Sequence, residues 1–198
     1  HGTICASSQC IATGQGATVA VTANRGIAHG RSATASNGVD TTAIGNTAVA
    51  SNSWSTAVGS RPVASGSAST AIGVTPLASG TSSVAIGDDA KSTSTDCLSQ
   101  GWRATASSQG CIAYGAQSVC NGLNGVVVGT QGSTNGVAGA VSLGYTASPS
   151  SSAFSFALAI NSASISTGSS FGITLNGATY RVPIVKSLFA TTVTAGQN

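Results

Sequence analysis

Apolar and polar positions alternate in two short motifs that return every 14 residues along the middle of the chain. The first motif places a small residue between two larger ones and ends in Gly, as in Thr42-Ala43-Ile44-Gly45, Thr56-Ala57-Val58-Gly59, Thr70-Ala71-Ile72-Gly73 and Val84-Ala85-Ile86-Gly87. The second motif has an aliphatic residue followed by Ala and Ser, as in Ala48-Val49-Ala50-Ser51 and Pro62-Val63-Ala64-Ser65. Such runs, bounded by Gly, Ser, Asn and Pro, indicate strands of about four to five residues joined by tight turns.

The period holds over a long stretch, which predicts a stacked repeat architecture. The motif glycine stays in phase from Gly45 to Gly129, and single-residue insertions separate this block from related motifs at 27–30 and 141–144. A Gly in every repeat disfavours helix. Two strands per repeat, stacked about 4.8 Å from the next repeat, form a parallel β-solenoid. We expect an all-β fold, with a β-roll of 14-residue coils over 27–147 and an N-terminal cap with the first irregular coils over 1–26.

The repeat also predicts which side chains point inward. One column of small residues contains Ala43, Ala57, Ala71, Ala85, Ser99, Ala113 and Val127, and a second contains Ala50, Ala64, Ala78, Ser92, Ala106 and Cys120. Successive residues of a strand point to opposite faces. If the small columns fill a narrow interior, the neighbouring column therefore points outward, and it consists of Ile44, Val58, Ile72, Ile86, Gln100, Tyr114 and Val128.

This outward column predicts self-association. A continuous apolar stripe on a soluble protein marks an interface. Each fully buried Ile or Val contributes about 1.5–3 kcal/mol, so burial between chains stabilises more than the Ala interior does. We expect an obligate oligomer whose interface contains Ile44, Val58, Ile72, Ile86, Tyr114 and Val128. The column on the other strand tolerates charge, so we place it toward solvent; it contains Val49, Val63, Leu77, Lys91, Thr105 and Val119.

The repeated motifs, Ser/Thr-x-Ala-Ile-Gly followed by Ala-x-Ala-Ser-Gly, resemble the head repeats of trimeric autotransporter adhesins (YadA-like heads) over about residues 27–147. The resemblance implies a left-handed parallel β-roll in a homotrimer. Similar repeats also occur in fibre-like structural proteins of large DNA viruses.

A different pattern begins near Pro149, and all four Phe lie beyond that point. Large apolar residues alternate with small ones on both sides of Asn176-Gly177, which is a strong hairpin signal. We expect residues 148–198 to form a small antiparallel β-domain. Its predicted core contains Phe154, Phe156, Leu158, Ile160, Phe171, Ile173, Leu175, Tyr180, Val182 and Ile184.

The five cysteines suggest disulfides. Cys5 and Cys10 lie close enough in the chain for a local bridge. Cys97 and Cys111 are one repeat apart, so stacking separates their Cα atoms by about 4.8 Å, inside the disulfide range of about 4.4–6.8 Å. A staple between these two coils is predicted, with two free thiols as the alternative. Cys120 occupies an inward Ala column and is expected to be a buried small hydrophobe.

Composition narrows the classes of function. Only 6% of residues are charged, against about a quarter in ordinary domains. The seven basic and four acidic residues form no runs, so nucleic-acid binding is not expected. No apolar stretch reaches the roughly 18 residues that span a bilayer, so membrane insertion is not expected either. Cysteines in a Ser/Thr-rich chain favour an extracellular, cell-surface or virion-surface location.

Candidate catalytic chemistry is sparse. His1 and His29 offer the residue types of a copper brace, but nothing in their spacing brings them together. Asp88 and Asp89 are adjacent, which suits a turn better than acid–base catalysis or a Ca²⁺ site. We expect no cofactor, no metal site and no catalytic residues, and hence not an enzyme.

The favoured function is a structural or adhesive fibre module that works as a homotrimer or filament. Its expected partner is the chain itself, and a host-surface or matrix ligand is a further candidate. The alternative is an ice- or glycan-binding solenoid, which needs a regular exposed array of Thr or aromatic residues. Thr42, Thr56 and Thr70 begin such an array, but Val84 ends it. Trp54 and Trp102 occupy turn positions, where anchoring a turn is favoured over contact with a sugar.

Overall fold

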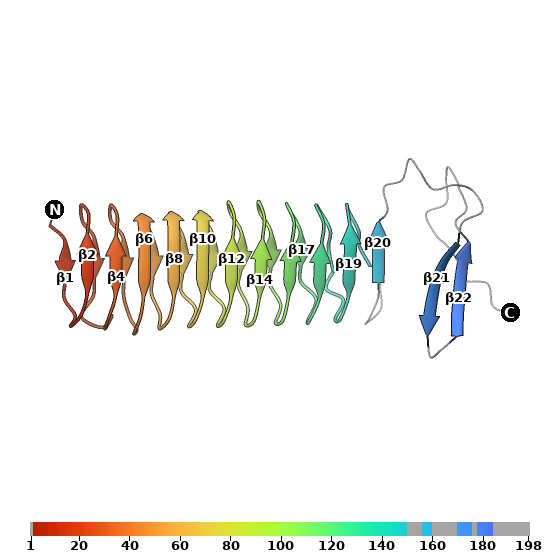
Figure 1. Ribbon diagram of the computed structural model, residues 1–198, viewed down its shortest axis with the longest axis horizontal. Coiled ribbons are helices and arrows are strands. Elements are labelled where there is room, and N and C mark those ends of the chain that lie inside the picture. The colour runs from red at the N-terminus through yellow and green to blue at the C-terminus, as the bar shows by residue number, and fades with distance from the viewer. Residues whose placement is uncertain (1, 150–155, 160–169, 176–177, 184–198) are drawn as a thin grey trace. The chain divides into compact units, whose positions relative to one another are not determined.

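The computed structural model describes residues 2–149, 156–159, 170–175 and 178–183 of the 198-residue chain. The chain divides into two compact units, His1–Ile160 and Asn161–Asn198. The first unit is an all-β parallel solenoid of about ten coils with about 14 residues each. Figure 1 shows its strands stacked side by side from β1 to β20. Among the described residues, no helix is long and apolar enough to cross a membrane.

Two parallel sheets form the walls of the solenoid; each coil from β1 to β18 contributes one strand to each sheet, and β19 and β20 extend only the larger one. The nine-stranded sheet contains β1 (Ile4–Cys5), β3 (Thr18–Val19), β5 (Thr34–Ala35), β7 (Val49–Ala50), β9 (Val63–Ala64), β11 (Leu77–Ala78), β13 (Lys91–Ser92), β15 (Thr105–Ala106) and β17 (Val119–Cys120). The eleven-stranded sheet contains β2 (Ile11–Thr13), β4 (Ile27–His29), β6 (Thr42–Asn46), β8 (Thr56–Ser60), β10 (Thr70–Val74), β12 (Val84–Ile86), β14 (Leu98–Gln100), β16 (Ile112–Tyr114), β18 (Val126–Val128), β19 (Val141–Gly144) and β20 (Phe156–Ala159).

The interior is as narrow as the small columns predict. The alanines of both inward columns are fully buried, and Ser92, Ser99, Cys120 and Val127 replace them without becoming exposed. Val127 fits because the facing position is Gly132, where an added Cβ would lie 2.7 Å from a Val127 methyl. Val19 is accommodated by Gly26 at the same distance. A larger side chain at one inward position is therefore matched by a glycine at the position facing it, which keeps the interior volume of each coil nearly constant.

The motif glycines are required by the way the coils stack. Gly73 has φ +133°, and an added Cβ would lie 2.4 Å from the carbonyl oxygen of Gly87 in the next coil. An L side chain would meet both backbone strain and a steric clash here. The same close approach recurs along the column, which explains why the glycine keeps its phase while neighbouring residues vary.

The solenoid begins within residues 1–26, where the first irregular coils were predicted, because β1 to β3 lie in this segment. Toward the C-terminus it is longer than the sequence pattern indicated. Phe156–Ala159 pairs in parallel with β19, with Val141 opposite Phe156, and not within the antiparallel domain expected from residue 148 onward. The pairing keeps a 15-residue step, as between β18 and β19, so the periodicity persists after its recognisable glycine is lost.

The second unit contains an antiparallel pair of strands, β21 (Ser170–Leu175) and β22 (Ala178–Pro183), with Ile173 opposite Tyr180. This agrees with the hairpin predicted around Asn176-Gly177. Phe154, Ile160 and Ile184 of the predicted core lie outside the described residues. Only the backbone is described for the other predicted core residues: Phe156, Leu158, Phe171, Ile173, Leu175, Tyr180 and Val182.

Candidate interaction faces of the solenoid

The outer face of the eleven-stranded sheet is two strand residues wide in each coil from β6 to β18, and a third position follows the motif glycine. Strand pairing aligns a first column of Thr42, Thr56, Thr70, Val84, Leu98, Ile112 and Val126, and a second column of Ile44, Val58, Ile72, Ile86, Gln100, Tyr114 and Val128. Two positions further on lies a third set, which we call the corner column: Asn46, Ser60, Val74, Asp88, Trp102, Ala116 and Thr130. In β6, β8 and β10 all three positions belong to the strand, whereas in the coils of β12 to β18 the corner position lies in the turn after the motif glycine.

The second column points outward, as predicted. Ile44 is 37% exposed, Ile72 38%, Tyr114 49% and Val128 41%, while Val58 and Ile86 are half-buried. The residues of the first column are half-buried or exposed and carry no charge. The uncharged surface is thus two columns wide, which sequence reasoning missed because it treated the first column as a Thr array that ends. The i, i+2 spacing of the two columns is the signal that identifies them as one surface.

The outer face of the nine-stranded sheet is narrower. Its strands are only two residues long, so each coil presents one outward strand residue. Val49, Val63, Leu77, Lys91, Thr105 and Val119 form this column, and all six are half-buried. Lys91 brings a charge into its middle. The two faces therefore differ in the number of outward columns and in charge, and not in the exposure of single residues.

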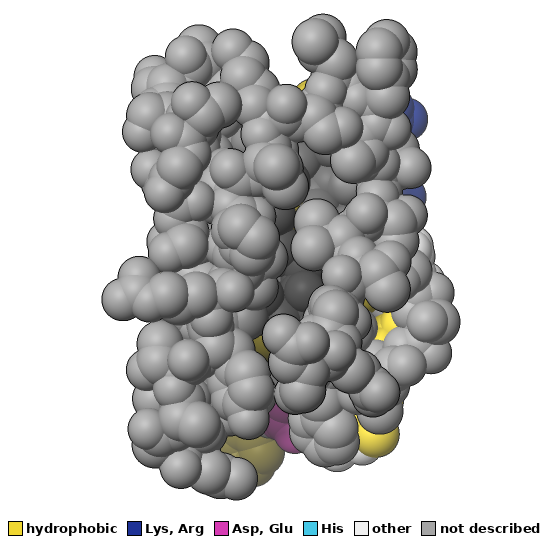
Figure 2. Space-filling model, turned by 90° about the vertical axis from the view of Figure 1, so that its right-hand side faces the viewer, with side chains coloured by type: hydrophobic (Ala, Val, Ile, Leu, Met, Phe, Trp, Pro, Cys, Tyr) yellow, Lys and Arg dark blue, Asp and Glu magenta, His cyan; other side chains and the backbone are white. Residues whose placement is uncertain are grey.

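Charged side chains gather at the turns between the sheets. Arg25 donates two hydrogen bonds to the Asp40 carboxylate, of 2.7 and 2.6 Å. Asp89 lies 3.2 Å from the Lys91 ammonium and 3.5 Å from the Arg103 guanidinium. The hydrogen bond from Arg25 lowers the pKa of Asp40, and that from Lys91 lowers the pKa of Asp89. All are solvent-exposed pairs that contribute little to stability. Figure 2 shows Lys and Arg side chains at one margin of the view.

The aspartate pair forms a turn, as expected. Asp88 and Asp89 follow β12, and Asp89 adopts a left-handed conformation with φ 55°. One coil further, Arg103 takes the same conformation and stacks over the ring of Trp102, with its guanidinium carbon 5.4 Å from the ring centroid. Asp89 therefore orients Arg103, and Arg103 in turn covers one face of the indole.

The cysteines confirm one predicted disulfide and contradict the other. Cys5 and Cys10 are bridged, with their Cα atoms 5.8 Å apart. Cys97 and Cys111, expected to be a staple, are buried free thiols, as is Cys120. Cys97 and Cys111 occupy the same inward column as the buried Ser69 and Ser83. The hydroxyls of these two serines donate to carbonyl oxygens of the preceding turn, at Gly66 and Gly80.

The direction of the two thiols explains the missing staple. Cys97 Sγ donates to the carbonyl of Ser108 at 3.0 Å, and Cys111 Sγ donates to the carbonyl of Gly122 at 3.1 Å. Each sulfur thus points to the turn of the next coil. Side chains stacked in parallel keep their Cβ atoms about one coil spacing apart, wider than the mean of about 3.8 Å in disulfides. A suitable Cα spacing alone was not sufficient.

Burial and mutual contact shift the titration of these thiols. Burial raises the pKa of Cys97. The contact with the Cys120 thiol lowers the pKa of Cys111 to about 7, while the contact with Cys111, together with burial, raises the pKa of Cys120. Cys111 has no exposed surface, so lack of access and not its acidity decides its reactivity in the folded chain.

No metal centre is assembled in the part of the chain that the structure describes. His1 lies outside the described residues, and His29 Nδ1 lies 2.5 Å from the hydroxyl of Thr13. Within the described ranges there is no group of three or more His, Cys, Asp or Glu that could hold a metal ion.

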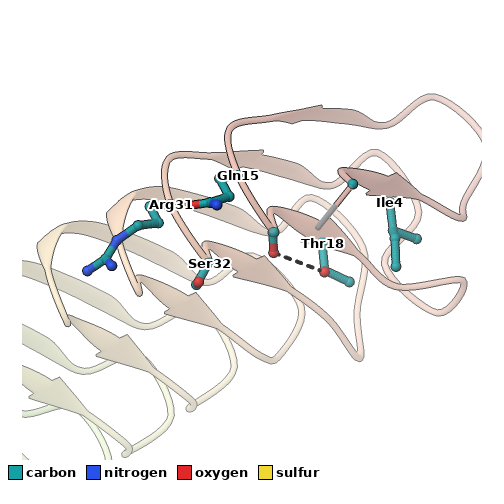
Figure 3. A pocket seen from close by; sticks show the side chains of 7 residues that line it. Ile4, Gln15, Thr18, Arg31 and Ser32 are labelled. Atoms are coloured by element: carbon teal, nitrogen blue, oxygen red, sulfur yellow. Dashed lines mark hydrogen bonds between the residues drawn. The ribbon is translucent and has the colours of Figure 1, made fainter.

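A hollow lies beside the first coils, with a volume of about 500 Å³. Ile4, Gln15, Thr18, Arg31 and Ser32 line it, together with Gly2 and Gly16. Figure 3 shows the Arg31 side chain extending away from Ile4, and its guanidinium donates to Asn46 at 3.2 Å. The polar groups of this hollow therefore do not converge on one point.

The chain matches no family model and no curated protein with which it was compared.

Proposed function

We propose that the chain is a non-enzymatic structural or adhesive fibre module that works as a homotrimer, or as a filament, outside a cell or on a virion surface. Its partner in this proposal is a further copy of the same chain. The neutral two-column face of the eleven-stranded sheet is the observation that carries the proposal. The Cys5–Cys10 bridge supports an oxidising compartment.

The two-column face supports self-association for an energetic reason. The interior is made of alanine and serine, which supply little apolar area per coil. The larger aliphatic residues lie outside, where the second column presents Ile44, Val58, Ile72, Ile86, Tyr114 and Val128 to solvent. Burying these side chains between chains adds apolar area that one solenoid lacks. The resemblance of the repeats to YadA-like heads favours three copies.

The proposal also concerns the two ends of the solenoid, where each sheet ends in an edge strand. An unpaired edge strand is a template for unwanted pairing unless it is covered. We infer that the second unit, residues 161–198, forms a small antiparallel β-domain built on β21 and β22. In an assembled fibre, a further copy of the chain can cover such an edge.

A matched pair of substitutions tests the proposed interface. Ile72 lies on the neutral face, and Leu77 of the same coil lies on the outer face of the nine-stranded sheet. Ile72→Asp places a carboxylate in the interface, which disfavours association because an unpaired buried charge is costly. We expect Ile72→Asp to reduce the mass in light scattering to that of one chain, and Leu77→Asp to leave the oligomer intact.

The controls separate assembly from folding. Both variants should keep the β-type circular dichroism spectrum, because both side chains are outside the core. Equal loss of assembly in the two variants, or equal retention, would contradict the assignment of the interface to the eleven-stranded sheet.

Ice or glycan binding is the second candidate, and one observation favours it. Thr42, Thr56 and Thr70 lie in register on β6, β8 and β10, so a regular array of hydroxyls does reach the surface. Thermal hysteresis of the purified chain tests the ice-binding version, which predicts a freezing point below the melting point.

A further inference from the structure

The corner column continues to Tyr145 and forms a surface that the proposed interface does not use. Its backbone is hydrogen-bonded from coil to coil: Gln117 N donates to Trp102 O at 2.7 Å, Gln131 N to Ala116 O at 2.9 Å, and Thr146 N to Thr130 O at 3.0 Å. Trp102, Ala116, Thr130 and Tyr145 are therefore consecutive members of one column.

The two aromatic residues of this column have equivalent backbone environments. Trp102 follows Gly101, with φ 134°, and precedes Arg103, with φ 55°. Tyr145 follows Gly144, with φ 109°, and precedes Thr146, with φ 54°. The Cα–Cβ bonds of both residues therefore leave the backbone in a similar direction, and the side chains are 48% and 56% exposed.

Small residues separate the two rings. Ala116 and Thr130 occupy the intervening coils, and their small side chains protrude less than the two aromatic rings. Three coil steps of about 4.8 Å place the rings about 14 Å apart along the solenoid. The result is a shallow strip with an exposed aromatic side chain at each end.

An amide ladder borders this strip. Gln117 and Gln131 follow Ala116 and Thr130 and take the left-handed conformation of that turn, with φ 57° and 59°. Their side chains are linked, since Gln131 Nε2 donates to Gln117 Oε1 at 3.2 Å. The remaining amide N–H and C=O groups supply both donors and acceptors along the strip.

The strip carries no charge. The sequence has no Asp, Glu, Lys, Arg or His between Arg103 and Arg181. The guanidinium of Arg103 lies at the Trp102 end, where it stacks on the indole. A ligand of the strip must therefore have an apolar face for the rings, hydroxyl or amide groups for the glutamines, an elongated shape, and no need for a counter-charge.

We propose that the strip from Trp102 to Tyr145 binds an extended, neutral oligosaccharide lying along the solenoid axis. The C–H face of a sugar ring is complementary to the electron-rich face of an aromatic ring. The hydroxyls exchange hydrogen bonds with the Gln117–Gln131 ladder. Arg103, held by Asp89, restrains the indole before binding and so reduces the entropy lost on binding.

One chain supplies the whole site, so the proposal does not depend on the oligomeric state. The corner column lies at the edge of the neutral face, and the second-column residues Tyr114 and Val128 lie beside it. The proposed interface uses the first two columns and not this edge. Saccharide binding and assembly can therefore fail separately.

Titration of the full chain with soluble hexasaccharides tests the proposal. The probes are cellohexaose, mannohexaose and chitohexaose, with a heparin hexasaccharide as the anionic comparison. Binding is followed by isothermal titration calorimetry and by tryptophan fluorescence of the Trp54→Ala variant, whose remaining tryptophan is Trp102. We expect saturable binding of at least one neutral probe, and weaker binding of its disaccharide, which cannot reach both rings.

Trp54 provides the matched control, since it is 59% exposed and lies in the turn before β8, away from the strip. Trp102→Ala and Tyr145→Ala should each weaken binding about tenfold or more, the effect of losing one aromatic stacking partner. Ala116→Leu should block the strip while keeping both rings. Trp54→Ala should change affinity less than about twofold, the ordinary result for a surface side chain outside a site.

Three results would overturn the proposal: no neutral probe binds, the heparin hexasaccharide binds more tightly than every neutral one, or Trp54→Ala weakens binding as much as Trp102→Ala. Light scattering of the same variants shows whether assembly is retained, so a failed oligomer is not mistaken for a failed saccharide site.

Discussion

At the residue scale, the interior of the solenoid tolerates change only when volume is conserved. An inward position normally holds Ala, and Val127 occurs where Gly132 faces it, just as Val19 faces Gly26. The alanine columns could be predicted from the alternation of the motif. The compensating glycines could not, because they lie outside the motif and their role depends on which turn residue approaches the interior.

The Val127–Gly132 pair gives a prediction about stability. Gly132→Ala alone should destabilise the fold by about 1–3 kcal/mol, because the added methyl group overpacks the coil. Combining it with Val127→Ala should restore much of that loss, since two Ala side chains then face each other, as at the equivalent positions Ala85 and Ala90. Urea unfolding of the two single variants and the double variant measures the coupling. Additive losses in the double variant would show that the two side chains do not share one volume.

At the element scale, periodicity predicted the strands and their parallel stacking, but not where they stop. The glycine-ended motif is lost beyond Gly144, yet β20 pairs with β19 at the same 15-residue step. The candidate faces were also predicted only in part. The alternation of the motif identified the outward Ile/Val column, but the strand register was needed to show that this column and the first column form one surface. The predicted disulfide between Cys97 and Cys111 failed for a related reason, because the spacing of a column gives the distance between Cα atoms and not the direction of the side chains.

The state of the cysteines can be checked by counting thiols. Cys97, Cys111 and Cys120 are buried and free, while Cys5 and Cys10 are bridged. We expect the folded protein to react slowly with a thiol reagent such as dithiobis-nitrobenzoate at pH 8, and the protein unfolded in guanidinium to titrate three thiols per chain. A single thiol per unfolded chain would contradict this assignment, and peptide mapping would then show whether Cys97–Cys111 or Cys111–Cys120 is bridged.

At the scale of the whole solenoid, the two sheets differ in what they offer to a partner. The nine-stranded sheet presents one outward strand residue per coil, with Lys91 among them, whereas the eleven-stranded sheet presents two neutral columns and a corner column. The width comes from the longer strands, such as the five residues of β10 against the two of β11. Assembly is thereby assigned to one side of the solenoid, and the proposed saccharide strip to its edge.

Sedimentation equilibrium of the purified chain tests self-association most directly. One chain has a mass of 19.0 kDa. We predict that the smallest species at micromolar concentration has three times this mass, and that reductant leaves the value unchanged because the neutral face and not a disulfide holds the chains together. A folded, monodisperse species with the mass of a single chain would contradict the account.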